Sequence, residues 1–221
     1  MQTILITGAN RGIGAALADA ALLRGLTVIG TRRDASRGGP SGVHWEQADM
    51  ADPASIRAMA ARLDGRPVDL LVCNAGIYPD KGQALADGYP PAMWAETFAV
   101  NVTGVFLTVQ ALLPNLRSGP GRIAILSSQM GSDARAPGGS YVYRASKAAV
   151  LNLGRNLAAD LAAEGLAVGI YHPGWVRTDM GGSAADIPAR EAAAGLMDRF
   201  DALSTDRTGV FETWDGRALP F

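Results

Sequence analysis

The pair of residues best suited to acid–base chemistry is a tyrosine and a lysine four positions apart, Tyr143 and Lys147. On a helix such residues share one face, so the two side chains can meet. A neighbouring ammonium stabilises a phenolate and lowers a tyrosine pKa from its reference value of about 10. Tyr143 could then donate a proton to a carbonyl oxygen, or accept one in the reverse direction. Tyr141 lacks such a partner, because Ala145 follows four residues later. We expect Tyr141 to line a cleft or to pack against neighbouring side chains.

A glycine-rich turn precedes this pair in the chain, with Gly8, Gly12 and Gly14 spaced as Gly-x3-Gly-x-Gly. It lies between strand-like residues 3–7 and residues 12–24, which have helical spacing. Glycines there permit positive φ and let the backbone approach a pyrophosphate, which helix N-terminal amides can bind. The strand–turn–helix context therefore favours a nucleotide site over an ordinary turn.

The elements that must position these motifs alternate between β-branched runs and alanine- and leucine-rich stretches. Strands are predicted at residues 3–7, 27–31, 43–46, 69–73, 122–126 and 167–171, and helices at 12–24, 53–63, 93–116 and 141–164. Asp52 before Pro53 marks a helix start, and Gly25, Gly65 and Gly165 mark helix ends. The alternation predicts a single-domain α/β fold over residues 1–221, a Rossmann-type doubly wound parallel sheet with helices on both faces.

Composition excludes several other classes. Twenty basic and 21 acidic residues give a net charge of −1 without a basic stripe, so neither nucleic acid nor a membrane surface is an expected partner. Cys73 is the single cysteine and there are two histidines, which predicts no disulfide and no metal site. With no export signal or long apolar run recognised, we expect a soluble, cytoplasmic protein.

The glycine loop resembles the Thr-Gly-x3-Gly-x-Gly loop of the short-chain dehydrogenases/reductases. Further motifs of that family follow in its order, namely Asn74-Ala75-Gly76, Asn101, Ser127-Ser128, Tyr143-x3-Lys147 and Pro173-Gly174. The resemblance spans nearly the whole chain and is closest to the sniffer-like and C-factor-like carbonyl reductases, on residues 143–147, 172–182 and 214–221. Cys73 departs from the pattern, because many members carry a second asparagine there; we expect it to be a small core residue.

The resemblance implies catalytic roles for four residues. Tyr143 is the general acid and base, and Lys147 also hydrogen-bonds the nicotinamide ribose. Ser128 is favoured over Ser127 as the serine that orients the carbonyl oxygen, since the family pattern places it three residues before a glycine, here Gly131. Asn101 is assigned a helix kink and a water that extends the proton relay from Lys147.

The cofactor preference is expected from the end of the second strand. NAD-preferring members of the family usually carry an aspartate there, whereas this strand ends in Arg32 and Arg33, and Arg11 lies in the glycine loop. Guanidinium groups match a 2′-phosphate in charge and geometry, which predicts NADP(H) as the preferred cofactor. NAD(H) stays possible, because Asp34 could reach the ribose after a shift of one or two residues.

The remaining cofactor contacts are carried over from the family motifs, with the Asp49 carboxylate meeting the adenine amino group. The predicted set comprises Gly8, Asn10, Arg11, Gly12, Ile13, Gly14, Arg32, Arg33, Asp49, Met50, Asn74, Ala75, Gly76, Tyr143, Lys147, Pro173, Gly174, Val176 and Thr178.

Substrate and assembly are predicted more coarsely. Residues 173–182 have glycines at both ends and large side chains between them, which indicates a mobile substrate lid at about residues 174–190. An apolar cleft suited to a hydrophobic ketone or aldehyde would be lined by Tyr78, Met130, Tyr141, Trp175 and Met180. Because the family usually pairs its long fourth and fifth helices, we expect a homodimer or homotetramer.

These observations predict an NADP(H)-dependent oxidoreductase that reduces a small carbonyl compound or oxidises the matching alcohol. The alternative is a catalytically silent dinucleotide-binding protein with a signalling or regulatory role, which the C-factor-like resemblance keeps open. A sugar-nucleotide epimerase would need a substrate domain for which 221 residues leave no room.

Overall fold

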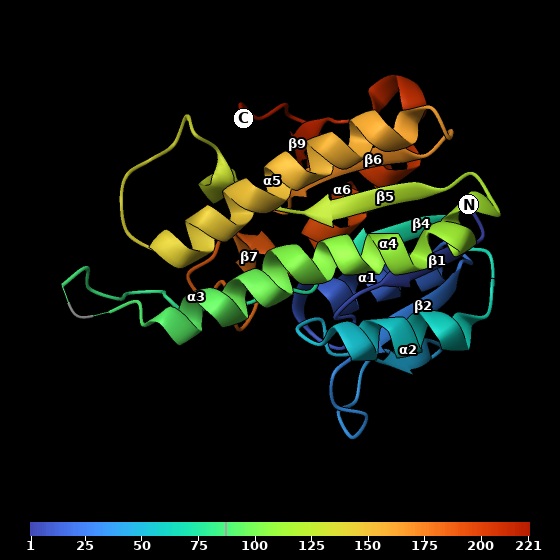
Figure 1. Ribbon diagram of the computed structural model, residues 1–221, viewed down its shortest axis with the longest axis horizontal. Coiled ribbons are helices and arrows are strands. Elements are labelled where there is room, and N and C mark those ends of the chain that lie inside the picture. The colour runs from blue at the N-terminus through green and yellow to red at the C-terminus, as the bar shows by residue number, and fades with distance from the viewer. Residues whose placement is uncertain (87) are drawn as a thin grey trace.

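The chain folds around one parallel sheet with helices on both faces (Figure 1). The computed structural model describes residues 1–86 and 88–221, and within them the sheet has seven strands in the order β3-β2-β1-β4-β5-β6-β9. Neighbouring strands all run parallel. The strands are β1 (Thr3–Ile6), β2 (Thr27–Arg32), β3 (His44–Gln47), β4 (Leu70–Cys73), β5 (Arg122–Leu126), β6 (Ala167–His172) and β9 (Phe211–Thr213). The predicted single-domain Rossmann-type α/β fold is confirmed.

Helices cover the two faces of the sheet and create two cores. They are α1 (Gly12–Leu23), α2 (Pro53–Leu63), α4 (Gly104–Arg117), α5 (Tyr141–Ala162) and α6 (Ala189–Asp201). The central strands are buried on both faces, which explains their nearly continuous aliphatic sequences. Alternate residues serve different cores: Leu5 and Leu71 pack with α2, α4 and α5, whereas Ile4 and Val72 pack with α1 and α6.

Helix boundaries follow the local signals in the sequence. Asp52 caps α2, where its side chain accepts a hydrogen bond from the amide of Ala54 at 2.8 Å and Pro53 opens the first turn. Gly25, Gly65 and Gly165 adopt positive φ between 69° and 77°, two or three residues after the last residue of their helices. Both kinds of signal were predicted and both are confirmed.

The predicted helix at 93–116 is one continuous helical stretch with an irregular middle. It comprises α3 (Pro91–Phe98), the π-helical turn η1 (Ala99–Thr103) and α4, and Asn101 lies in the π-helical turn. By length and apolar composition, residues Pro91–Arg117 would also suit a membrane span, but core helices pass the same test, and 44% of the apolar window is buried within the fold. That no membrane partner exists stays a prediction.

Sequence reading missed the elements after β6. Strand β9 has three residues, too few to show a period, and completes the edge of the sheet beside β6. Helix α6 does carry a signal, because its buried residues fall at helical spacing: Ala192, Ala193, Leu196, Met197 and Phe200. Between β6 and α6, the short strand β7 (Val176–Arg177) pairs with β8 (Ile187–Pro188). The predicted lid at 174–190 therefore contains a two-stranded ladder and overlaps the start of α6.

Two ionisable side chains are buried at strand ends. Cys73 ends β4, and burial raises the pKa of its thiol to about 12, as expected for an inert core residue. His172 ends β6 and is 7% exposed, and its Nδ1 makes no hydrogen bond within the described part of the chain. Burial, and then the positive charges of Arg135, Lys147 and Arg217, lower the pKa of His172 to about 4. The imidazole is therefore neutral at pH 7.

The buried imidazole predicts a loss of stability in acid. Because the folded-state pKa of His172 lies below the unfolded value of 6.5, the unfolded chain binds the extra proton first. Its contribution to the free energy of unfolding is complete above pH 6.5 and is lost as the pH falls towards 4. Chemical denaturation of wild type and His172→Asn should give a stability difference that changes by about 3 kcal/mol between pH 7 and pH 4. His44→Asn, at an exposed position, is the control; a pH-independent difference for His172→Asn would contradict this account.

Candidate active site

The glycine loop between β1 and α1 has the conformation that only glycine allows. Gly8 and Gly12 have φ of +66° and +56°, and a Cβ placed on Gly14 would lie 2.2 Å from the carbonyl oxygen of Gly8. Asn74, which follows β4, braces the loop because its Nδ2 donates to the carbonyl oxygens of Thr7 and Gly8 at 2.8 and 3.1 Å. The ends of β1 and β4 therefore fix the glycine loop.

This cradle fits the pyrophosphate of a dinucleotide. Helix α1 begins at Gly12 with no acidic residue in its first turn, and the N-cap residue Arg11 makes no side-chain hydrogen bond to the helix amides. Amides at such an N-terminus bind phosphate oxygens, and the helix dipole favours the negative charge. Of the other residues in the predicted set, Asn10 lies in the turn before α1 and Ile13 lies in the first turn of α1.

The three predicted 2′-phosphate ligands have different surroundings. The Arg32 guanidinium stacks on the Trp45 ring at 4.9 Å, and Arg33 follows it at the exposed end of β2. Arg11 instead forms an ion pair with Asp179 of the lid at 3.0 Å, with both side chains largely exposed. Arg32 and Arg33 therefore stand at the expected place, whereas Arg11 reaches towards the lid.

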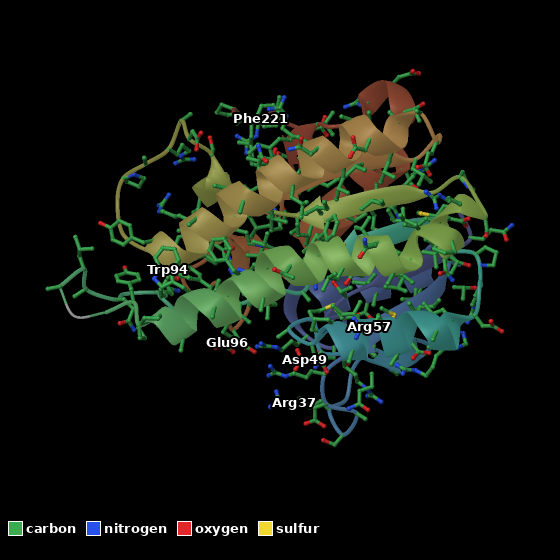
Figure 2. The ribbon with its side chains drawn as sticks, in the orientation of Figure 1. Arg37, Asp49, Arg57, Trp94, Glu96 and Phe221 are labelled. Atoms are coloured by element: carbon green, nitrogen blue, oxygen red, sulfur yellow. The ribbon has the colours of Figure 1, made fainter. Side chains whose placement is uncertain are left out.

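Two acidic residues of this region, Asp34 and Asp49, each accept hydrogen bonds within their own loop. Asp34, the possible ribose ligand, turns into its own loop and accepts hydrogen bonds from the amide and hydroxyl of Ser36. These bonds, and then Arg37 and Arg32, hold the pKa of Asp34 below its usual value. Asp49 accepts a hydrogen bond from the amide of Ala51. Figure 2 shows Asp49 and Arg37 on the same side of the molecule, near the loop that joins β2 to β3.

The residues after β6 approach the glycine loop from the other side. Gly174 has φ +88°, which turns the chain after Pro173. The Thr178 methyl group lies 3.5 Å from the position a Cβ on Gly12 would take. Val176 is buried in β7, so the start of the predicted lid is seated against the predicted cofactor loop.

The four predicted catalytic residues are all buried, and they come from three elements. Asn101 lies in η1, Ser128 follows β5, and Tyr143 and Lys147 lie in the first two turns of α5. A Cβ on Gly76 would lie 3.3 Å from Asn101 Oδ1 and 3.6 Å from Lys147 Nζ, so both polar groups border this glycine. The structure therefore brings the predicted residues to one place at the carboxyl end of the sheet.

The two adjacent serines have different partners. Ser127 donates its hydroxyl to the carbonyl oxygen of Lys147 at 2.9 Å and so ties β5 to α5. Ser128 accepts from the amide of Met130 at 3.1 Å, and its hydroxyl acts on the Tyr143 phenol, whose pKa it lowers. This arrangement agrees with the choice of Ser128 over Ser127 for the position beside the reacting oxygen.

The electrostatics of Tyr143 differ from the expectation based on spacing. Burial raises the pKa of Tyr143 above its ordinary value, the Ser128 hydroxyl lowers it, and Tyr78 and Asp80 raise it further. Lys147 is not among the groups that shift this pKa; its Nζ donates to the carbonyl oxygen of Leu126 at 2.8 Å and lies 5.6 Å from the centre of the Tyr143 ring. Burial lowers the pKa of Lys147 to about 8. Tyr143 is thus a neutral phenol, the form that donates a proton.

Asn101 is held by protein groups. Its Oδ1 accepts from the amide of Ile77 at 2.8 Å, and its Nδ2 donates to the carbonyl oxygen of Ile77 and the hydroxyl of Ser146. Ser146 in turn donates to the carbonyl oxygen of Tyr143 at 2.8 Å. The side chain therefore links the segment after β4 to the first turn of α5.

Aromatic and apolar side chains surround the predicted cleft. Tyr141, Trp175 and Met180 are each between 39% and 47% exposed, which a substrate-binding rim requires. Trp175 donates to the carbonyl oxygen of Gly181, and Lys81 donates to the same oxygen and to that of Met180. Figure 2 shows Trp94 where the start of α5 passes α3.

Sequence reasoning missed the residues that hold Tyr143 from outside its helix. Tyr78 was predicted only as a cleft residue, but its ring stacks on that of Tyr143 with 4.1 Å between centroids and 20° between planes. Asp80 was not singled out, although its carboxylate accepts hydrogen bonds from the backbone at the start of α5. No spacing rule links these residues to Tyr143, more than 60 positions along the chain.

Comparison with known proteins agrees with this site. The sequence model of the short chain dehydrogenase family matches residues 2–187. The chain is 39% identical over 168 residues to C-signal of Myxococcus xanthus, which covers 75% of this chain and all of that protein.

Two solved structures superpose on the whole chain. NADPH-bound carbonyl reductase from chicken fatty liver has a TM-score of 0.90 at 30% identity over 99% of its own chain. Carbonyl reductase Sniffer of D. melanogaster has a TM-score of 0.91 at 28% identity and is covered completely.

Proposed function

The chain belongs to the short-chain dehydrogenase family, and from this we propose that it is an NADP(H)-dependent carbonyl reductase that can also oxidise the matching alcohol. The observation that carries the proposal is the buried group of Ser128, Tyr143 and Lys147, in which the Ser128 hydroxyl lowers the pKa of the Tyr143 phenol and Lys147 Nζ lies 5.6 Å from the centre of its ring. Two hydroxyls in this arrangement can hold a carbonyl oxygen and protonate it.

The proposed mechanism divides the work among the residues of the chain. Bound NADPH would supply the hydride to the carbonyl carbon. Ser128 donates a hydrogen bond to the substrate oxygen, which polarises the carbonyl, and Tyr143 donates the proton that completes the alcohol. Lys147 would hold the nicotinamide ribose, and Asn101 keeps the segment after β4 in register with α5. In the reverse direction Tyr143 accepts the proton.

We propose a small hydrophobic ketone or aldehyde as the substrate. Tyr78, Met130, Tyr141, Trp175 and Met180 would contact it, and their surfaces offer few partners for a polyhydroxylated sugar. Similarity to two carbonyl reductases supports the carbonyl group as the reacting centre. The alternative function is that of a nucleotide-binding signalling protein without turnover, and the similarity to C-signal supports this alternative.

We further propose a cytoplasmic enzyme that assembles as a homodimer or homotetramer and binds neither membrane nor nucleic acid. The balanced charge and the single buried thiol of Cys73 support the cytoplasmic assignment. The assembly would use the outer faces of α4 and α5, where Phe106 is 39% exposed.

The first test separates an enzyme from a silent binder. Tyr143→Phe removes only the hydroxyl, so NADPH affinity should stay near the wild-type value while carbonyl reduction falls by about 100-fold or more. Lys147→Ala should weaken both NADPH binding and turnover. Tyr141→Phe is the matched control and should retain most activity. Normal turnover by Tyr143→Phe would disprove the assignment, and tight NADPH binding without reduction of any carbonyl compound would favour the signalling function.

Cofactor choice is tested at the end of β2. If Arg32 and Arg33 bind the 2′-phosphate, replacing both with alanine should weaken NADPH by roughly 10-fold or more and leave NADH nearly unchanged, since solvent screens each contact. Arg66→Ala, exposed beyond α2, is the control. Equal wild-type affinity for NADH and NADPH, measured by fluorescence titration, would rule this out.

Assembly is tested by sedimentation at micromolar concentration. Wild type should sediment as a dimer or tetramer of the 22.9 kDa chain, and Phe106→Glu should shift it towards the monomer because a charge would be buried at the interface. Leu23→Glu, exposed on α1 at the opposite face, should leave the assembly intact. A wild type that sediments only as a monomer would contradict the proposal.

A further inference from the structure

The first turn of α5, which carries Tyr143, has no side-chain cap of its own. Its N-cap residue Ser140 is in the left-handed region at φ +49° and makes no capping hydrogen bond. The cap comes from Asp80, in the segment between β4 and α3. Asp80 Oδ2 accepts from the amides of Val142 and Tyr143 at 2.8 and 3.2 Å. The residue is fully buried, so this contact is shielded from solvent.

Asp80 contributes a negative charge as well as a hydrogen-bond acceptor. Its second oxygen, Oδ1, is buried and makes no hydrogen bond to any described residue, and no ion pair with the described part of the chain neutralises the carboxylate. Burying an uncompensated carboxylate is costly, and the two amides and the dipole of a 22-residue helix offset only part of that cost. A neutral asparagine could accept the same two hydrogen bonds, so capping alone does not account for the charge.

The neighbours of Asp80 hold the same turn. The Tyr78 ring stacks on Tyr143, and its hydroxyl lies 2.6 Å from the hydroxyl of Ser140. Ile77 is joined through Asn101 and Ser146 to the carbonyl oxygen of Tyr143. Residues 77–80 therefore contact the backbone of the first turn of α5, the ring of Tyr143 and the N-cap residue Ser140. Movement of this segment would move the phenol.

We propose that Asp80 is a positioning residue that fixes the backbone of Tyr143 and places a negative charge against the helix turn that carries the phenol. This inference rests on the proposed function, in which Tyr143 is the acid. The polar and charged groups around Tyr143 are Tyr78 and Asp80 from the segment after β4, Ser128 from the end of β5 and Lys147 from α5 itself. Asp80 is the anion in this set.

The sign of the electrostatic effect follows from Coulomb attraction and repulsion. A carboxylate beside a phenol disfavours the phenolate, in agreement with the upward contribution of Asp80 to the pKa of Tyr143. Asp80→Asn keeps an acceptor oxygen and removes the charge, so Tyr143 should ionise at lower pH. Asp80→Ala removes both the cap and the charge.

The experiment compares wild type, Asp80→Asn and Asp80→Ala, with exposed Asp133→Asn as the control. In Asp80→Asn, NADPH affinity and KM should stay within about 3-fold while the alkaline limb of the kcat profile for reduction moves to lower pH. In Asp80→Ala, kcat should fall by about 10- to 100-fold, and combining it with Tyr143→Phe should add no further loss. An Asp80→Asn profile identical to that of wild type, or losses that multiply in the double variant, would overturn the inference.

A readout without turnover keeps the two proposals distinguishable. Alkaline titration of tyrosinate absorbance, as the difference between each protein and its Tyr143→Phe counterpart, reports the ionisation of Tyr143 alone. A downward shift in Asp80→Asn supports the inference even if wild type reduces no carbonyl compound, and an unchanged titration overturns it even if wild type is active. Asp80→Asn carries the test should Asp80→Ala fail to fold.

Discussion

Parallel pairing of the central strands is the constraint on which the rest of the structure depends. Ile6 pairs with Val72, and Cys73 with Ile125, so the residues that follow β1, β4 and β5 emerge side by side at one edge of the sheet. The glycine loop, Asn74 and the serines after β5 come from these three segments. Burial of the strands between two helical layers stabilises this register, because a slip by one residue would exchange the two cores.

The same burial sets the chemistry of the site. Tyr143, Lys147 and His172 lie where water is excluded, and burial is the largest cause of the pKa shift of each one. A neutral phenol is suited to give a proton to a developing alkoxide, and the polar groups around it are fixed before substrate arrives. Ionisable groups buried together without full compensation cost stability, and they are characteristic of functional sites.

The sequence predicted what is local and missed what is not. The glycine loop and the Tyr143–Lys147 pair could be found because strand ends and helix spacing bring their residues together within short segments, and Asn74 could be found through the resemblance to the family motif Asn74-Ala75-Gly76. Asp80 could not be found, because it binds backbone amides 62 residues away and no residue pattern encodes that contact. The pKa of Tyr143 shifts in the direction opposite to the predicted one for a related reason: spacing shows that Lys147 is near, but not that the phenol is buried, and burial is the largest cause of the shift. Strand β9 was too short to show a period.

Transfer of a labelled hydride tests the central claim most directly, namely that this site holds a nicotinamide ring against a carbonyl carbon. The protein would be incubated with a hydrophobic aldehyde and NADPH carrying deuterium at one or the other C4 position of the ring. The account predicts deuterium on the carbinol carbon from one C4 position only, because a bound ring presents a single face to the substrate. An alcohol that carries no deuterium with either labelled cofactor, or that carries it equally with both, would contradict the account.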